Sequence, residues 1–270
     1  MIKFEKTEVV GWEAAIRGMR NPMNSWEKSD SGYCMDTLPC HSCKISRNNC
    51  KKCIEDHAFI IGSNDTDLMK RLRNAGTDHR KFMRMIVVYA DITAPLYWWK
   101  EFDTYKVGTV ANSCSTMHKI HAKEFTIDDF SYDHLDGETI PLFEDGNLIY
   151  DDGSRGTYNC SAYDFLCIIC DVLNKYRDLY LKTKDKKYWW QMIQLLPSSY
   201  NQKRTVMLNY EVLANIYKSR KNHKLDEWKE HDYLSKEDLS YENTFEKHAG
   251  FCDWIRTLPY SELITREEGE

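Results

Sequence analysis

The alternation of hydrophobic and polar positions predicts several helices around a small amount of strand. Residues 1–20 are expected to form a short strand and then the start of a helix, and residues 83–92 to form a buried strand. Amphipathic helices are expected at 162–183 and at 185–195, the second ending before Pro197. This order of elements favours the α+β class, as a helix-rich single domain over residues 1–270 built around a small sheet.

Helix start and stop signals mark two further helices. Asn64 or Asp65 is expected to cap a helix that ends at Gly76. Thr93 is expected to cap an aromatic helix that has Pro95 in its first turn. The acidic stretch 125–158 is expected to be an irregular surface excursion.

The segment 195–228 is interpreted as one long helix with polar groups on its apolar face. At about 100° per residue, one side collects Val206, Val212, Leu213, Ile216 and Tyr217. Asn209 and Arg220 fall on that side, and so does His223 if the helix extends so far. A buried amide and guanidinium are costly unless a protein group or a ligand satisfies them. Arg220 therefore either pairs with an acidic neighbour in the core or binds a phosphate or carboxylate, which its forked donors suit.

A cysteine-rich insert is expected at residues 30–57. Cys40 and Cys43 form one Cys-x-x-Cys knuckle, and Cys50 and Cys53 form another. Four thiolates at this spacing suit a structural, tetrahedral Zn²⁺ site, with an iron–sulfur cluster or unligated thiols as the alternatives. Cys167-x-x-Cys170 lies in an apolar helix instead, where buried structural thiols are expected.

Composition and charge narrow the class of protein. The net charge of −5 gives no reason to expect a nucleic-acid binder. The chain has no 18-residue apolar run and no signal peptide, so neither membrane insertion nor secretion is expected. The 10 cysteines then indicate reduced or metal-bound thiols in a cytoplasm.

The segment that begins at Leu196-Pro197 resembles the C-terminal motif of flavin-dependent thymidylate synthases. That motif is LP, a basic residue, N-x-x-x-L-x-N, and an Arg five residues later. The matching residues here are Leu196, Pro197, Lys203, Asn209, Leu213, Asn215 and Arg220. The resemblance implies that Arg220 clamps the nucleotide and that Asn209, Asn215 and His223 lie by the flavin. It also implies that Lys203 or Arg204 supplies a second cation near the nucleotide phosphate.

The resemblance covers about residues 64–228, but the central R-H-R motif of the family is missing. Asp103-Thr104-Tyr105 stand at its place, while Ser113 matches a later Ser expected to bind substrate. The preceding turn holds His79, Arg80 and Lys81, which would approach the flavin or remain a solvated basic turn. Either other residues rebuild the pocket that R-H-R forms in the family, or this chain is a homologue that binds a different ligand. The candidates for rebuilding are Lys100, Lys106, His118 and Lys119.

The resemblance implies methylation of deoxyuridine monophosphate to thymidylate by a cytoplasmic homotetramer. FAD would be the cofactor, and NADPH and methylenetetrahydrofolate the co-substrates; the protein would need no cysteine nucleophile. Two alternatives remain: a non-catalytic nucleotide- or flavin-binding homologue, and a zinc-containing interaction protein.

Overall fold

The computed structural model describes residues 2–33, 59–141, 148–149, 155–156, 159–235, 238–240 and 249–266. The cysteine knuckles at Cys40, Cys43, Cys50 and Cys53 lie outside these residues. The chain divides into two compact units. The first comprises Met1–Lys3, Ile92–Thr104 and Asn112–Arg204, and the second comprises Phe4–Asp91, Tyr105–Ala111 and Thr205–Glu270.

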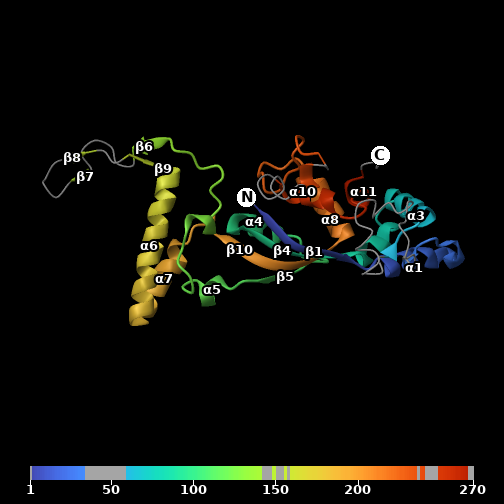
Figure 1. Cartoon of the computed structure of the whole chain (residues 1–270), viewed down its shortest axis with the longest axis horizontal. Helices are drawn as coiled ribbons and strands as arrows, with labels where there is room; N and C mark the ends of the chain where they lie inside the picture. Colours follow the sequence, from blue (N-terminus) through green and yellow to red (C-terminus); the bar gives the residue numbers. More distant parts are fainter. Residues whose placement is uncertain are drawn as a thin grey trace, which may run out of the picture. The chain divides into compact units, whose positions relative to one another are not determined.

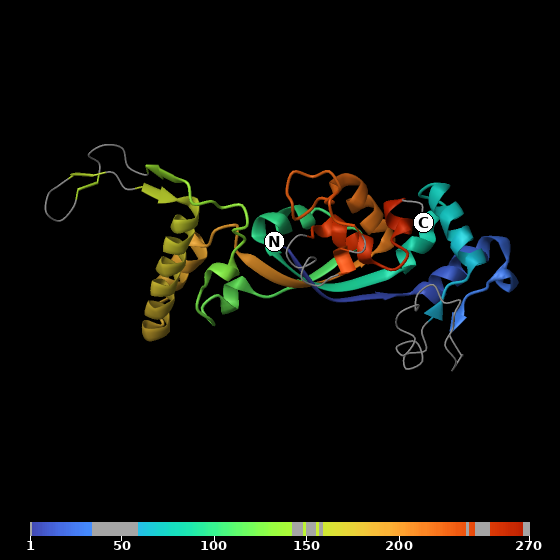
Figure 2. The same ribbon diagram turned by 45° about the horizontal axis from the view of Figure 1, so that its top comes forward.

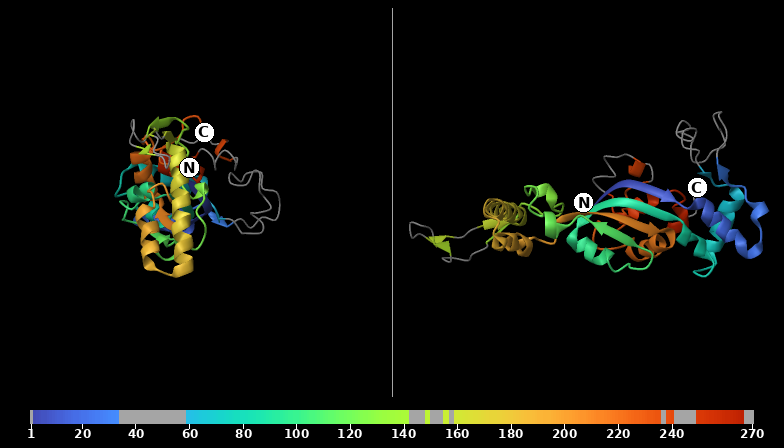
Figure 3. Two further views of the ribbon diagram at one scale, coloured as in Figure 1. Left: turned by 90° about the vertical axis from the view of Figure 1, so that its left-hand side faces the viewer. Right: turned by 90° about the horizontal axis from the view of Figure 1, so that it is seen from below.

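A four-stranded sheet has the strand order β1-β4-β10-β5, which the right-hand view of Figure 3 shows. Its strands are β1 (Lys3–Val10), β4 (Val87–Pro95), β10 (Asn201–Asn209) and β5 (Val110–Ser113). In β4 every second residue is fully buried: Val88, Ala90, Ile92 and Ala94. Because successive side chains of a strand point to opposite faces, this alternation fixes the face that packs into the core.

Residues 201–209 form a strand, so the prediction of one helix over 195–228 is wrong for this stretch. In β10 the side chains of Gln202, Val206 and Leu208 are buried. These positions are separated by even numbers of residues, as expected for one face of a strand. Pairing with β4 and β5 outweighs the apparent helical periodicity of this short segment. The helix α8 begins only at Tyr210 and ends at Arg220.

In the first unit, two helices pack side by side, α6 (Ala162–Thr183) and α7 (Lys186–Leu195), as Figure 1 shows. Ser161 caps α6 by accepting a hydrogen bond from the backbone N–H of Asp164 at 3.0 Å. Leu166, Cys170 and Leu173 repeat at helical spacing and are buried in the cluster that also holds Met192. Burial raises the pKa of the Cys170 thiol to about 11, as suits a structural residue.

The first unit also contains a short aromatic helix, α4 (Leu96–Phe102). Its residues Trp98, Trp99 and Phe102 are buried. Pro95, not Thr93, is the residue before its first turn, because Thr93 still belongs to β4. The remaining elements of this unit are α5 (Thr116–Lys119), η4 (Ile127–Asp129), β6 (Thr139–Pro141), β7 (Leu148–Ile149), β8 (Arg155–Gly156) and β9 (Asn159–Ser161).

In the second unit, the helices α8, α10 (Phe251–Thr257) and α11 (Glu262–Thr265) contact one another (Figure 2). Trp254 of α10 is buried and donates a hydrogen bond from its indole nitrogen to Thr7 at 3.1 Å. The other elements are α1 (Trp12–Arg20), η1 (Asn21–Met23), η2 (Trp26–Lys28), β2 (Gly32–Tyr33), β3 (Phe59–Ile60), α3 (Ser63–Asn74), η3 (Arg80–Met85) and η5 (Asp238–Ser240). No helix within the described ranges is both long enough and apolar enough to span a bilayer.

A remote carboxylate caps α3, which begins at Ser63 after Gly62. Asp30 accepts hydrogen bonds from the backbone N–H groups of Asn64 and Asp65, at 2.9 and 3.1 Å. The prediction that Asn64 or Asp65 caps the helix is therefore wrong. Asp65 is fully buried and accepts hydrogen bonds from Arg20, Ser29 and Ser31.

We expect Asp65→Asn to lower the free energy of unfolding by about 3 kcal/mol at neutral pH, because it removes one partner of a buried ion pair. Burial raises the pKa of Asp65, but hydrogen bonds from Ser31, Ser29 and Arg20 and the charge of Arg20 leave that pKa below its ordinary value. The ionised form therefore stabilises the fold fully above the unfolded pKa of about 3.9, and this stability is lost as the pH falls through the lower folded pKa.

Urea unfolding of wild type and Asp65→Asn between about pH 7 and about pH 3 checks this prediction. The difference in free energy of unfolding between the two proteins should narrow only at the acid end of this pH range. A gap that is the same at every pH would contradict it.

Candidate functional site

The second unit contains a cavity of about 190 Å³, here called the cationic cavity, which is built largely by one face of α8. It is lined by Arg80, Ala214, Asn215, Tyr217, Lys218, Lys221, Ile264, Thr265 and Arg266. Residues three or four positions apart share a face of a helix, so α8 and the residue after it present Asn215, Lys218 and Lys221 together. Among the described residues, the lining includes four cations and no carboxylate.

Buried ionic contacts hold Arg80 at the wall of the cationic cavity. The Arg80 side chain lies 3.3 Å, Nε to Oε1, from Glu211, and its Nη2 donates a hydrogen bond to Asn215 Oδ1 at 3.1 Å. Arg80 and Glu211 are both buried, and Arg84 donates a second hydrogen bond to Glu211. A buried charge is tolerated when it is paired, so Glu211 allows a guanidinium to sit here. The arrangement suits an anionic group such as a phosphate.

Asn209 begins α8 and has a structural part in doing so. Its side-chain oxygen accepts a hydrogen bond from the N–H of Val212 at 3.0 Å, the usual N-cap contact. Gly108, with φ at +75°, lies so close that a Cβ there would be 2.6 Å from Asn209 Nδ2. Only glycine suits this combination of positive φ and close approach.

Arg220, at the end of α8, lies among aromatic groups and does not line the cationic cavity. Its Nε donates a hydrogen bond to the Tyr105 hydroxyl at 2.8 Å, and its Nη1 lies 2.7 Å from His223 Nε2. The guanidinium also lies over the rings of Tyr105 and Trp228, at 5.7 and 5.0 Å from their centroids. Tyr105 stands in the segment that replaces the R-H-R motif, so the replacement residue is in direct contact with the predicted clamp.

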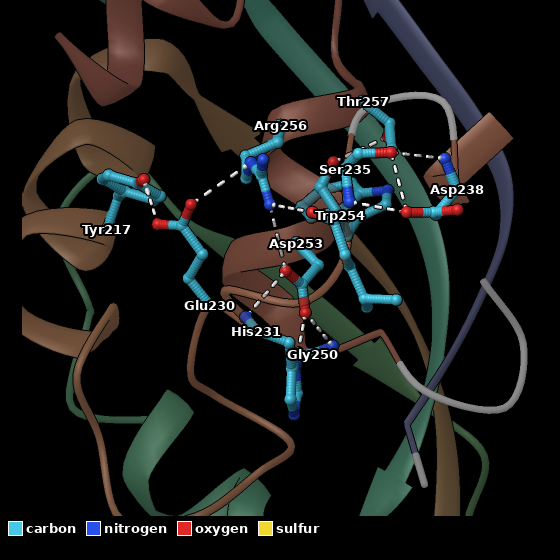
Figure 4. Close-up of polar contacts among 11 residues, drawn as sticks. Tyr217, Glu230, His231, Ser235, Asp238, Gly250, Asp253, Trp254, Arg256 and Thr257 are labelled. Atoms are coloured by element: carbon cyan, nitrogen blue, oxygen red, sulfur yellow. Dashed lines mark hydrogen bonds and ion pairs between the residues drawn. The ribbon is translucent and has the colours of Figure 1, made fainter. Parts of the chain in front are cut away.

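A polar network joins Tyr217 of the cationic cavity to α10, as Figure 4 shows. The Tyr217 hydroxyl donates a hydrogen bond to Glu230, and Glu230 pairs with Arg256 at 3.3 Å. Arg256 also lies 3.7 Å from the fully buried Asp253. Asp253 accepts from the backbone N–H groups of His231 and Gly250 and lies 2.6 Å from His231 Nδ1. The network ties the segment after α8 to α10.

The first unit contains a second cavity, of about 410 Å³, here called the lysine cavity. It is lined by Thr93, Cys114, Ser115, Thr116, Lys119, Ile120, Lys123, Asp128, Asp129, Tyr200, Asn201, Gln202 and Lys203. The backbone N–H of Cys114 donates to the carbonyl of Lys203 at 2.9 Å, which places the residue after β5 beside β10. Asn201 Oδ1 is buried and has no hydrogen-bond partner among the described residues. Lys123 pairs with Asp129, and Lys119, Lys203 and the carboxylate of Asp128 also line the wall.

Arg204 contacts the other part of the segment that replaces the R-H-R motif. Its Nη1 lies 2.7 Å from Asp103 Oδ1, its Nε donates to Gln202 Oε1 at 2.9 Å, and its guanidinium lies 4.2 Å from the centroid of the Trp99 ring. These contacts fix the position of the Arg204 side chain within the first unit.

Three other residues expected at a site, His79, Lys81 and Ser113, have exposed side chains.

The structure therefore brings together two residues expected at a cofactor site, Arg80 and Asn215, and places Lys203, expected at a substrate site, in the lysine cavity. Sequence reasoning missed Lys218, Lys221 and Arg266. The spacing of Lys218 and Lys221 from Asn215 could have revealed the first two, because they share a helix face. Arg266 comes from the far end of the chain, and no local pattern links it to α8. In the part of the chain that the structure describes, no group of three or more His, Cys, Asp or Glu side chains could hold a metal ion.

Lysine and arginine side chains line the cationic cavity, and lysine and aspartate side chains line the lysine cavity; comparison with solved structures identifies the fold. No protein-family model and no curated protein sequence matches the chain. A thymidylate synthase X (ThyX) from Helicobacter pylori, crystallised with FAD and dUMP, matches with a TM-score of 0.53 and 12% identity, over 98% of this chain and 97% of that chain. A second structure, of the flavin-dependent thymidylate synthase ThyX from Helicobacter pylori complexed with FAD and dUMP, matches with a TM-score of 0.52 and 13% identity, over 97% of each chain.

A UMP/dUMP methylase, PolB from Streptomyces cacaoi bound with 5-Br dUMP, matches with a TM-score of 0.45 and 13% identity, over 87% of this chain and 81% of that chain. The two ThyX matches show that the chain has the fold of the flavin-dependent thymidylate synthases. This confirms the expected fold, a helix-rich α+β arrangement around a small sheet.

Proposed function

We propose that the chain is a flavin-dependent enzyme that methylates deoxyuridine monophosphate or modifies a closely related pyrimidine nucleotide. The shared fold supports this function, since the matching ThyX structures hold FAD and dUMP. The observation that carries the proposal is the meeting of Arg80 and Asn215, which are 135 positions apart in sequence, at one cationic cavity. The resemblance alone already implies a position near the flavin for both residues.

The cationic cavity fits the diphosphate of FAD. Arg80, Lys218, Lys221 and Arg266 offer positive charge, and a cavity of about 190 Å³ suits a diphosphate better than the whole cofactor. The rest of the flavin would then extend beyond this cavity, as expected of the proposed homotetramer with flavin sites between subunits. The flavin supplies the redox chemistry, with NADPH as the reductant and methylenetetrahydrofolate as the carbon donor.

The lysine cavity is the proposed site of the nucleotide phosphate. Lys203 and Lys119 would pair with the phosphate, and the partnerless Asn201 Oδ1 would accept a hydrogen bond from the ligand. Ser113 lies next to this wall in sequence, while Arg204 would shape the wall through its hydrogen bond to Gln202, which lines the cavity. Arg220, in the second unit, is proposed separately, from the resemblance alone, as an electrostatic clamp of the nucleotide, with His223 beside it.

One observation favours a second candidate, a homologue that binds nucleotide or flavin without catalysis. The residues at the place of the R-H-R motif contact both predicted substrate cations: Asp103 contacts Arg204, and Tyr105 contacts Arg220. A guanidinium that is already bonded to protein groups must give up those bonds before it can bind a substrate.

The test is formation of thymidylate from dUMP with FAD, NADPH and methylenetetrahydrofolate. We expect turnover by the wild type, and a loss of about 10²-fold or more in kcat for Arg220→Ala, because a charge that stabilises the transition state is removed. Lys224→Ala, an exposed cation close to Arg220 in sequence, is the control and should keep wild-type activity. A wild type that binds FAD and dUMP but makes no thymidylate would support the second candidate.

Zinc at Cys40, Cys43, Cys50 and Cys53, and a cytoplasmic location, remain part of this proposal. Zinc binding would be structural and independent of the reaction. Metal analysis of the native protein should find a stoichiometric ion.

A further inference from the structure

The second unit contains a third hollow, here called the aromatic cavity, with a volume of about 360 Å³. It is lined by Glu13, Ile16, Arg17, Arg20, Trp26, Ser29, Ser31, Gly32, Tyr33 and Phe59. None of these residues lines the cationic cavity, so the two hollows are separate features of the same unit.

Three aromatic side chains form the walls of the aromatic cavity and two of them are strongly exposed. Trp26 is 50% exposed and Tyr33 is 54% exposed. Phe59 packs edge-to-face on Tyr33, with ring centroids 5.2 Å apart. Exposed aromatic surface gathered around a hollow is a common mark of a binding site, because covering it removes apolar area from water.

The walls are held in place before any ligand arrives. Asp65 accepts hydrogen bonds from Ser29 at 2.7 Å and from Ser31 at 2.6 Å, and Arg20 donates to the same carboxylate at 2.6 Å. The indole nitrogen of Trp26 donates to Asn21 Oδ1 at 2.8 Å, which fixes the orientation of the ring. A pre-formed site loses little conformational entropy when a ligand binds.

The rim of the aromatic cavity offers both an acceptor and a donor. Glu13 accepts a hydrogen bond from the Tyr33 hydroxyl at 2.9 Å and lies 3.8 Å from Arg17. The side chains of Glu13 and Arg17 are 55% and 65% exposed, so both can turn towards a ligand. A carboxylate that accepts and a guanidinium that donates match the mixed edge of a heteroaromatic ring.

We propose that the aromatic cavity binds a planar heteroaromatic ring of nucleobase size, stacked on its aromatic walls with its polar edge at Glu13 and Arg17. The proposal rests on the rings, the cavity and the rim, and does not depend on the function proposed above. The ligand class is a free nucleoside or nucleotide, whose base has the flat face and the mixed edge that this hollow presents.

The experiment is titration of the full chain with adenosine by isothermal calorimetry. Adenosine carries no phosphate, so the cationic cavity gives it no charge to bind. We expect saturable binding by the wild type and a loss of affinity of about tenfold or more in Trp26→Ala and in Tyr33→Ala, because base stacking on one aromatic ring contributes about that much. Trp190→Ala, which removes a tryptophan that is 44% exposed in the first unit, should bind like the wild type.

Three results would overturn the proposal. Adenosine, guanosine, cytidine and uridine could all fail to bind the wild type. Trp26→Ala and Tyr33→Ala could both keep wild-type affinity while melting like the wild type. Adenosine binding could instead disappear in Arg80→Ala, which would place the nucleoside in the cationic cavity. Adenosine is also one half of FAD, so it is the Trp26→Ala and Tyr33→Ala variants, and not binding by the wild type alone, that place it in the aromatic cavity. Formation of thymidylate is measured separately, so each result is distinct from a failure of the proposed reaction.

Discussion

Replacing Asp253 with alanine is expected to lower the free energy of unfolding by about 3–5 kcal/mol. The carboxylate is fully buried, and it accepts from the backbone N–H groups of His231 and Gly250. It also faces the ring of His231 and the guanidinium of Arg256. The alanine would leave two buried N–H groups without an acceptor and the partly buried guanidinium of Arg256 without one of its partners. Chemical denaturation, followed by circular dichroism, measures the change.

The matched control is Asp232→Ala, which removes an exposed aspartate next to His231 in sequence. Its effect should stay within about 0.5 kcal/mol, as is usual for surface changes. Equal stability of Asp253→Ala and the wild type would mean that the network in Figure 4 does not hold the segment after α8 to α10.

Arg80→Ala is expected to weaken FAD binding by about 10- to 100-fold. Charge-assisted hydrogen bonds to phosphate contribute about 1.5–3 kcal/mol each, and the substitution also frees Asn215 from its partner. Quenching of flavin fluorescence on binding gives the dissociation constant directly.

Arg84→Ala separates the loss of the cavity cation from the loss of the ion pair with Glu211. Arg84 donates to the same carboxylate, but its side chain is 56% exposed and does not line the cationic cavity. We expect Arg84→Ala to keep FAD affinity within a factor of about three, since it leaves the lining residues in place. Equal losses in the two variants would instead indicate that Glu211 pairing, and not cavity charge, controls binding.

The elements that could be predicted from sequence are those with a long periodic pattern and a local start signal. Helix α6 covers the predicted range 162–183 because its apolar stripe extends for many turns and Ser161 caps it. Strand β4 begins at Val87, later than predicted, since Arg80–Met85 forms a short 3-10 helix before it.

Strand β10 could not be separated from helix α8 by pattern alone. Val206 and Val212 fit one helical stripe, yet Val206 belongs to a strand whose place is set by its sheet neighbours. Asn209 carried the missing signal, because an Asn before an apolar run is a favourable N-cap and it does begin α8.

The resemblance predicts some residues of the cavities but not how those residues are held. It implies that Arg80 and Asn215 lie near the flavin, and the structure places them in contact. Their contact depends on Glu211, whose role rests on burial and on pairing with two arginines, neither of which sequence spacing reveals. The contacts of Arg220 and Arg204 with the segment that replaces R-H-R likewise needed three-dimensional information.

Flavin-dependent nucleotide chemistry is tested most simply by the visible absorption spectrum of the purified protein, reconstituted with FAD and titrated with dUMP. We expect bound flavin with absorption bands that shift and saturate as dUMP is added, because the nucleotide binds beside the flavin. A protein that takes up no FAD, or whose flavin bands do not respond to dUMP, would contradict the proposal that this fold serves flavin-dependent nucleotide chemistry.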